Sequence, residues 1–330
     1  MPSSPGAINR AAAPGPRVER AYNPFTWSKR TRRNFAVGMA FISPWTIGFL
    51  IFTLYPMVAS LVYSFSEYTF RQPLEWVGLA NYLALLRDRY FWIALANTAY
   101  MVLLGVPLML AFSLLCAVVL NIKTPGQSIY RLIYYIPSIV PTIAATLLWV
   151  WILNPQYGLL NTLLGALGIQ GPNWLRDPLW SKPSLLLMAL WSAGNVMIIY
   201  LSGLQDVPTQ ILEAADLDGA TWWQRMRHIT LPMVSPITLY NLITLSIFMF
   251  QYFAQAYVFA HVSGQNAEGA SAIGQPLNST LFYSLYLYQN AFQFLKMGYA
   301  SAMAWILFLV ILAFTLVLLR VFDRFGYNSE

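Results

Sequence analysis

Long apolar runs separated by shorter polar segments make up most of this chain. None of the six longest runs carries an Asp, Glu, Lys or Arg in its middle. Each is long enough to cross the roughly 30 Å hydrocarbon layer of a bilayer as a helix. The runs extend over Asn34 to Phe65, Trp92 to Leu120, Leu132 to Leu153, Ser184 to Leu204, Ile237 to Val262 and Met297 to Leu319. This pattern predicts an all-α, polytopic membrane protein with six transmembrane helices.

The composition excludes a water-soluble globule and supports a membrane orientation. Hydrophobic residues make up 58% of the chain and charged residues only 9%, which is typical of a protein solvated by lipid. Cytoplasmic loops are enriched in Lys and Arg. If the N-terminal tail is cytoplasmic, 13 of the 19 basic residues fall on that face: Arg10, Arg17, Arg20, Lys29, Arg30, Arg32, Arg33, Lys123, Arg131, Arg225, Arg227, Arg320 and Arg324. The net charge of +7 therefore indicates topology in the cell (inner) membrane, with both termini cytoplasmic, and not nucleic-acid binding.

A segment rich in charge, glycine and proline interrupts the apolar pattern between the fourth and fifth runs. It covers Glu213 to Pro236 and reads EAADLDGATWWQRMRHITLPMVSP. We expect one short helix from Thr209, a break at Asp218-Gly219 and a second helix capped by Thr221. That second helix would present three bulky apolar side chains from a polar background: Trp222, Trp223 and Met226. The pattern favours a docking element over a loop lying on the lipid surface, which would have Lys and Arg flanks.

This segment resembles the EAA motif of permease subunits of ABC importers. The residues that stand where the motif places them are Glu213, Ala214, Ala215, Asp218, Gly219, Ala220, Gln224, Ile229, Thr230, Leu231, Pro232 and Pro236. In that family the loop forms coupling helices that dock into a cleft of a cytoplasmic ATPase subunit. The resemblance implies a MetI-like permease fold, and it implies that the ATPase is contacted by Glu213, Ala214, Ala215, Asp218, Gly219, Ala220, Trp223, Gln224 and Met226.

Other motifs resemble the carbohydrate branch of these permeases. They are Asn97-Thr98, Arg131, Pro137, Asn154, Gly158, Asn161, Trp174-Leu175, Gly203-Leu204, Pro208, Ser279-Thr280 and Gly298 to Ala302. One departure is the external loop from Ser263 to Pro276, which is longer and less glycine-dense than is usual in the family. The resemblance covers the chain from about Asn34 to Phe322.

The domain organisation follows from the apolar runs and the motif. Residues 1–33 are expected to form a largely disordered basic cytoplasmic tail, and residues 34–95 the first transmembrane helix with an external loop. Residues 96–322 form the expected permease core, with the coupling loop at 205–236. Residues 323–330 are expected to form a cytoplasmic C-terminal tail.

Residues that could support catalysis or bind a metal are scarce. Cys116 is the one cysteine, so a thiolate metal site and a disulfide framework are both excluded. His228 and His261 fall on opposite membrane faces in the predicted topology. The Gly-rich phosphate loop that ends in Gly-Lys-Ser/Thr is missing, since Lys123 follows Ile122. We therefore predict no catalytic or metal-binding residue and no cofactor held by this chain, with ATP and Mg²⁺ bound by a separate ATPase.

Polar residues within the apolar runs predict the path of a solute, because polar groups are costly in lipid and face the bundle interior. In the fifth run a continuous helical stripe is predicted at Asn241, Thr244, Phe248, Gln251 and Gln255. The predicted substrate pathway comprises Gln251, Gln255, Tyr252, Asn195, Trp191, Ser192, Ser138 and Thr142. Neutral amides and hydroxyls among aromatic rings suit a sugar.

A competing interpretation assigns structural roles to such residues. Asn, Gln, Ser and Thr in membrane helices often hydrogen-bond to neighbouring helices without contacting a solute. We expect Asn241 and Ser202 to act in this way. Trp149 and Trp151 are expected to be interfacial anchors, and the aromatic segment from Leu281 to Phe292 a lid or scaffold packed on the bundle.

The sequence thus predicts a transport subunit and not an enzyme. It would be the permease of an ATP-driven, binding-protein-dependent importer for a sugar or oligosaccharide, forming half of the translocation pathway. The implied partners are a second homologous permease, two ATPase subunits and an external solute-binding protein. Two alternatives stay open: a permease for another polyhydroxylated or phosphorylated solute such as glycerol-3-phosphate, and an ion-coupled secondary transporter. The second would need an intramembrane carboxylate, Lys or His.

Overall fold

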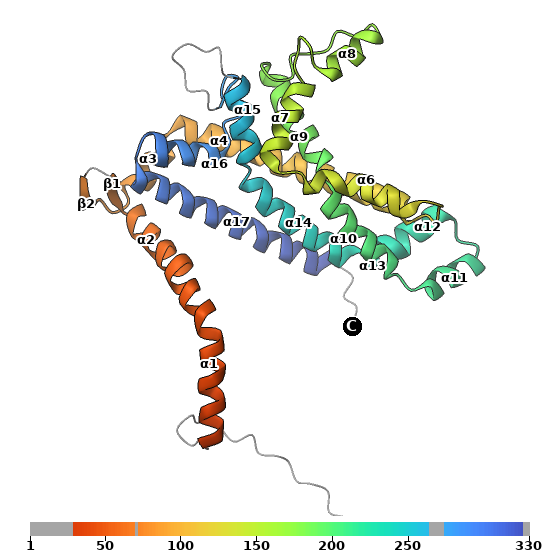
Figure 1. Cartoon of the computed structure of the whole chain (residues 1–330), viewed down its shortest axis with the longest axis horizontal. Coiled ribbons are helices and arrows are strands. Elements are labelled where there is room, and N and C mark those ends of the chain that lie inside the picture. Colours follow the sequence, from red (N-terminus) through yellow and green to blue (C-terminus); the bar gives the residue numbers. More distant parts are fainter. Residues whose placement is uncertain (1–28, 70–71, 264–273, 326–330) are drawn as a thin grey trace, which may run out of the picture. The chain divides into compact units, whose positions relative to one another are not determined.

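The structure, a computed structural model, describes residues 29–69, 72–263 and 274–325 (Figure 1). Helices make up most of these residues, as the apolar pattern predicts. The chain divides into two compact units, residues 1–58 and 59–330. Each unit is described by itself.

The first predicted span forms one long helix. Helix α1 (Lys29–Phe49) continues through the π-helical turn η2 (Leu50–Leu54) into α2 (Tyr55–Ser64), which gives 36 helical residues. No residue of α1 is buried within the chain. A helix that is apolar all round and buried by nothing in its own chain is solvated by lipid or covered by another protein.

A small antiparallel sheet follows, which the all-α prediction did not include. Strand β1 (Ser66–Thr69) pairs with β2 (Gln72–Trp76), with Ser66 opposite Trp76. Helix α3 (Ala80–Arg87) then covers the base of the hairpin. The Asn81 side-chain amide donates to the backbone oxygens of Ser64 and Ser66, both at 3.0 Å.

The second predicted span is confirmed as a continuous helix of 33 residues. It consists of α4 (Arg89–Tyr100), the π-helical turn η3 (Met101–Gly105) and α5 (Val106–Asn121). Asp88 caps it by accepting a hydrogen bond from the Tyr90 backbone N–H at 2.8 Å. At Gly105 a β-carbon would come within 2.8 Å of the Leu186 side chain. The glycine therefore permits the close approach of α9 (Pro178–Trp191).

The third and fourth predicted spans are not single helices. The third divides into α6 (Gln127–Ile139) and α7 (Thr142–Ile152), which meet at 100°. Pro141 lies at the break, where its missing N–H and its effect on the preceding residue end the helix. The fourth divides into α9 and α10 (Gly194–Gln205), which meet at 49°. Among the described residues, four helices are long and apolar enough to cross a membrane, or six if each bent pair counts as one span.

The fifth predicted span is interrupted as well. Helix α14 (Ser235–Phe250) stops, and α15 (Ala254–Ser263) starts after three residues. Of the predicted polar stripe, Asn241, Thr244, Phe248 and Gln255 line one cavity across this break, and Gln251 does not. The remaining elements are α8 (Leu159–Ala166), α11 (Thr209–Leu217), α12 (Trp222–Arg225), η4 (Met226–Thr230), α13 (Leu231–Met233), α16 (Tyr283–Tyr288), η5 (Gln289–Gln293) and α17 (Met297–Phe325).

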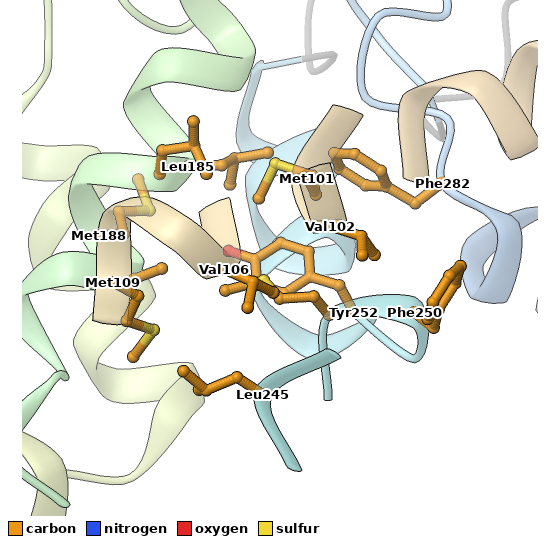
Figure 2. Close-up of a cluster of buried hydrophobic side chains, with 14 of the residues drawn as sticks. Met101, Val102, Val106, Met109, Leu185, Met188, Leu245, Phe250, Tyr252 and Phe282 are labelled. Atoms are coloured by element: carbon orange, nitrogen blue, oxygen red, sulfur yellow. The ribbon is translucent and has the colours of Figure 1, made fainter. Parts of the chain in front are cut away.

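The buried core of the second unit lies where α4, η3, α5, α9, α14 and α16 meet. Figure 2 shows its side chains, with the Tyr252 ring among Met101, Val106 and Phe282. All of these residues are almost fully buried. At one edge of this core Met109, Met188 and Leu245 also line a large cavity. The core therefore forms one wall of the site described next.

Candidate functional site

The segment predicted to dock on an ATPase folds as two short helices, as its sequence predicts. Helix α11 ends at Leu217, and Gly219 adopts a left-handed φ of +76°, which glycine tolerates without steric cost. Thr221 and Gln224 form a capping box at the start of α12. An ion pair between Arg225 and Asp216 joins the two helices.

Six of the nine predicted docking residues are exposed, and three are half-buried. The exposed ones are Glu213, Ala214, Asp218, Gly219, Trp223 and Gln224; the half-buried ones are Ala215, Ala220 and Met226. Trp222 and Leu217, which lie outside that set, are also exposed, and Leu217 reaches 91%. Large apolar side chains exposed on a polar segment are typical of a protein–protein contact. Leu217, directly before the Asp218-Gly219 break, is not among the predicted docking residues.

A cavity of about 620 Å³ lies at the breaks of the three interrupted helices. It is lined from α5, α6, α7, α9, α10, α14 and α15. Ser138 and Thr142 flank the first break, Ser192 forms the second, and Gln255 follows the third by two residues. Irregular backbone is tolerated at membrane depth where it lines a cavity or is buried in protein.

The cavity gathers five of the eight predicted pathway residues from three separate spans. These are Ser138, Thr142, Ser192, Asn195 and Gln255. Its other polar or aromatic residues are Tyr135, Thr146, Trp149, Tyr240, Asn241, Thr244 and Phe248. Among the described residues, no Asp, Glu, Lys or Arg lines it. The arrangement offers a neutral surface of hydroxyls, amides and rings.

The other three predicted pathway residues lie outside the cavity lining. Tyr252 is buried in the core, where its ring packs edge-on against Phe282 with centroids 5.7 Å apart. Gln251 is exposed at the C-terminal cap of α14. Trp191 lines a smaller cavity of about 210 Å³ and packs edge-on against Trp149 at 6.1 Å. The break after α14 turned Gln251 and Tyr252 away from the face that a continuous helix would have given them.

Two residues assigned to structural roles from the sequence lie in the cavity wall instead. Asn241 makes no hydrogen bond to a neighbouring helix through its Nδ2 atom among the described residues. Trp149 is half-buried, whereas Trp151 is 56% exposed. The expected roles of Asn241 in joining helices and of Trp149 as an interfacial anchor stay predictions. Their position depends on contacts between separate helices.

Hydrogen bonds hold together the end of the second unit that lies opposite α11 and α12. Asp88 accepts hydrogen bonds from the hydroxyls of Tyr286 and Tyr299. Burial alone would raise the pKa of Asp88, but these hydroxyls and two backbone N–H groups lower it below its ordinary value. Burial and the neighbouring carboxylate raise the pKa of Tyr286 to about 12. Asp88 is therefore ionised and fixes α4, α16 and α17 relative to one another.

The aromatic segment from Leu281 to Phe292 packs on the bundle, as expected of a scaffold. Its Tyr283 backbone N–H donates to Thr98 Oγ1 at 2.9 Å, and its Tyr283 hydroxyl donates to the Met303 carbonyl at 2.8 Å. Asn97 Nδ2 donates to the Leu281 carbonyl at 3.0 Å. Most of the loop predicted to depart from the family, residues 264–273, lies outside the described residues.

Comparison with known proteins gives consistent matches along the chain. Residues 109–325 match the family described as binding-protein-dependent transport system inner membrane component. The probable ABC transporter permease protein YesP of Bacillus subtilis (strain 168) is 41% identical over 89% of this chain and 92% of its own length. The lactose transport system permease protein LacF of Rhizobium radiobacter is 34% identical over 83% of this chain and 90% of its own length.

A solved structure has the same fold. One chain in the crystal structure of a bacterial alginate ABC transporter, in complex with an alginate pentasaccharide-bound periplasmic protein, matches with a TM-score of 0.73. The match covers 92% of this chain and 99% of that chain at 23% identity. At that identity the likeness shows the fold, an all-α permease fold.

Proposed function

Because the chain belongs to the family of binding-protein-dependent transport system inner membrane components, we propose that it imports a sugar or oligosaccharide through the cavity at its helix breaks. It is a permease subunit, a transport component and not an enzyme. The observation that supports the proposal best is the cavity lining. Amides, hydroxyls and aromatic rings from three spans meet there without any charged side chain.

The chemistry of the cavity favours a polyhydroxylated solute. Sugar hydroxyls both donate and accept hydrogen bonds, and the C–H face of a sugar packs against aromatic rings. Relatives of this chain include permeases named for lactose and for arabinooligosaccharides. A phosphorylated solute such as glycerol-3-phosphate would call for Arg or Lys near its phosphate, and the lining has neither.

The proposed assembly contains partners that supply the energy and the solute. A second homologous permease would complete the pathway, two ATPase subunits would bind ATP and Mg²⁺, and an external solute-binding protein would deliver the sugar. This chain would hold no cofactor. The exposed face of α11 and α12, including Trp223 and Gln224, would dock on the ATPase. Closure of the ATPase pair on ATP would then move this segment.

The proposed orientation places the coupling segment and both termini in the cytoplasm of a cell with this chain in its inner membrane. The bias of Lys and Arg along the sequence supports it. In this orientation α6, α10 and α14 form the cytoplasmic halves of the interrupted spans, and α7, α9 and α15 the external halves. The cavity lies where each span passes from one half to the other.

Uptake into proteoliposomes tests the proposal. The complex of this chain with its second permease, ATPase and binding protein should accumulate a labelled sugar when Mg-ATP is enclosed with the ATPase. Glu213→Arg should abolish sugar-stimulated ATP hydrolysis and uptake without preventing membrane insertion. Ser192→Phe should fill the cavity and abolish uptake while basal ATP hydrolysis continues. Uptake that needs an ion gradient and no ATP would refute the proposal.

A further inference from the structure

Two buried nitrogen atoms in the cavity wall have no hydrogen-bond partner in the part of the chain that the structure describes. They are Nε1 of Trp149, on α7, and Nδ2 of Asn241, on α14. Asn241 as a whole is only 2% exposed. Buried donors in native proteins are nearly always paired, and each unpaired donor costs the free energy of its desolvation. Two of them in one cavity wall therefore need an explanation.

Three of the hydroxyl groups around the same cavity already donate their protons to backbone carbonyls. Ser138, Thr146 and Thr244 each donate to a backbone carbonyl three or four residues earlier, at 2.7, 2.7 and 2.9 Å. A hydroxyl bonded in this way keeps its lone pairs and presents the cavity with an acceptor. The indole N–H of Trp149 and the amide N–H of Asn241 are donors of this wall that have no such partner among the described residues.

We propose that Trp149 and Asn241 determine solute specificity by donating hydrogen bonds to two neutral acceptor atoms of the solute. Ring, glycosidic or hydroxyl oxygens of a saccharide are such acceptors. The indole N–H can only donate, so a hydroxyl opposite Trp149 must act as an acceptor there. The proposal rests on the proposed function of the cavity, and it adds the two residues that recognise the solute through hydrogen bonds.

The packing of the two side chains supports recognition over a purely structural role. The Trp149 ring packs edge-on against the Trp191 ring with centroids 6.1 Å apart. A residue that joins helices would use its donor on a neighbouring helix, and Nδ2 of Asn241 does not among the described residues. Both nitrogens are shielded in this conformation. Small side-chain rotations toward a solute would give them the partners that they lack.

Chemically altered sugars provide the first arm of the test. The probes are lactose, maltose, trehalose and an arabinotriose, followed by the singly deoxygenated and singly O-methylated derivatives of whichever sugar the reconstituted complex transports. A deoxy derivative lacks the acceptor oxygen, whereas an O-methyl derivative keeps it and only loses the donor. At one or two ring positions we expect the deoxy derivative to enter about fivefold to a hundredfold more slowly than the parent, with the O-methyl derivative close to the parent.

Variants of this chain provide the second arm, with the same binding protein in every assay so that its own preferences cancel. Trp149→Phe keeps an aromatic ring and Asn241→Leu keeps a branched side chain, but both remove the N–H donor. Each variant should reduce the discrimination against one deoxy position to about twofold or less. Trp151→Phe is the matched control for the indole. Ser246→Ala is the control for a buried polar group of α14, because the Ser246 hydroxyl donates to the Leu242 carbonyl at 2.6 Å and lies outside the cavity lining. Both controls should discriminate like the wild type.

The outcomes separate this inference from the proposed function. If Ser192→Phe stops uptake while Trp149→Phe and Asn241→Leu discriminate like the wild type, the two donors do not read the solute and the cavity remains the pathway. If Ser192→Phe transports normally, the pathway assignment itself fails. Wild-type transport that is indifferent to every deoxy position also overturns the inference, and that measurement needs no variant to fold.

Discussion

Replacing Tyr252 with Phe should stabilise the subunit, although the change removes a polar group. Tyr252 is 1% exposed, and its hydroxyl has no hydrogen-bond partner among the described residues. Figure 2 shows the ring surrounded by apolar side chains, including Met101 and Val106. The wild-type chain therefore bears the cost of desolvating a hydroxyl without the compensation of a hydrogen bond.

The expected magnitude follows from that missing partner. An unpaired buried polar group costs about 1–3 kcal/mol, and Tyr252→Phe removes this cost while keeping the ring contacts. One kcal/mol shifts the midpoint of thermal unfolding by about 2–4 °C in a domain of 150–250 residues, so an increase of about 2–12 °C is expected. Tyr252→Ala also removes the ring and should lower stability by about 3–5 kcal/mol.

Thermal unfolding of the purified complex measures this effect. Tyr283→Phe is the matched control, because the Tyr283 hydroxyl is also buried but donates to the Met303 carbonyl at 2.8 Å. Tyr283→Phe should lower the unfolding midpoint. A decrease for Tyr252→Phe as well would show that its hydroxyl has a partner and would refute the reasoning. Uptake by Tyr252→Phe should be preserved, whereas a hydroxyl that binds the sugar would make it fall.

Three further predictions concern coupling, stability and topology. Gly219→Ala should cost about 1–2 kcal/mol because the residue has φ +76° with open space around it, and sugar-stimulated ATP hydrolysis should fall more than basal hydrolysis. The folded pKa of Asp88 lies below its ordinary value. The stability that the ionised Asp88 gives the fold should therefore be complete above about pH 4 and disappear as the pH falls through the folded pKa. Thermal unfolding at several pH values should show this dependence in the wild type and a flatter one in Asp88→Asn. With Cys116→Ala as background, Ala166→Cys should react with a membrane-impermeant maleimide added outside, and Arg227→Cys should not; the reverse pattern would invert the topology.

The coupling segment could be predicted closely from the sequence because its structure is local. The cap at Thr221 and the left-handed turn at Gly219 depend on residues within a few positions of each other. The same holds for the apolar side chains of α12, which stand out against their polar neighbours. Its exposed surface needs no distant residue to form.

The helix breaks were only partly predictable. Pro141 gives a local reason for the first break. The bend itself could not be predicted, because the apolar run continues across the break and hydropathy carries no information on the direction of a helix axis. The second and third breaks contain no proline, and Ser192 and Gln251 are unremarkable in sequence. Their conformation depends on packing against other helices. Of the stripe predicted along the fifth span, Asn241, Thr244, Phe248 and Gln255 line the cavity, and Gln251, at the break, does not.

The cavity itself depends on contacts that no single segment contains. Ser138, Ser192 and Asn195 were predicted as polar positions in separate spans, and the fold brings them together. Trp149 and Asn241 were assigned other roles, because a tryptophan near a span end and an asparagine in a helix have several common functions. The missing hydrogen-bond partners that single them out exist only in three dimensions.

The three helix breaks divide the core into two sets of rods with different neighbours. On the side of the coupling segment, α10 packs against α6 and α14; beyond the breaks, α15 packs against α7. An unbroken helix transmits a displacement along its whole length, whereas the two halves of a broken helix can rotate relative to each other at the break. In the proposed mechanism, a displacement of α11 and α12 would act on the near set as a block, with the joints as pivots. The subunit would in this way open the cavity on one side without first loosening the other.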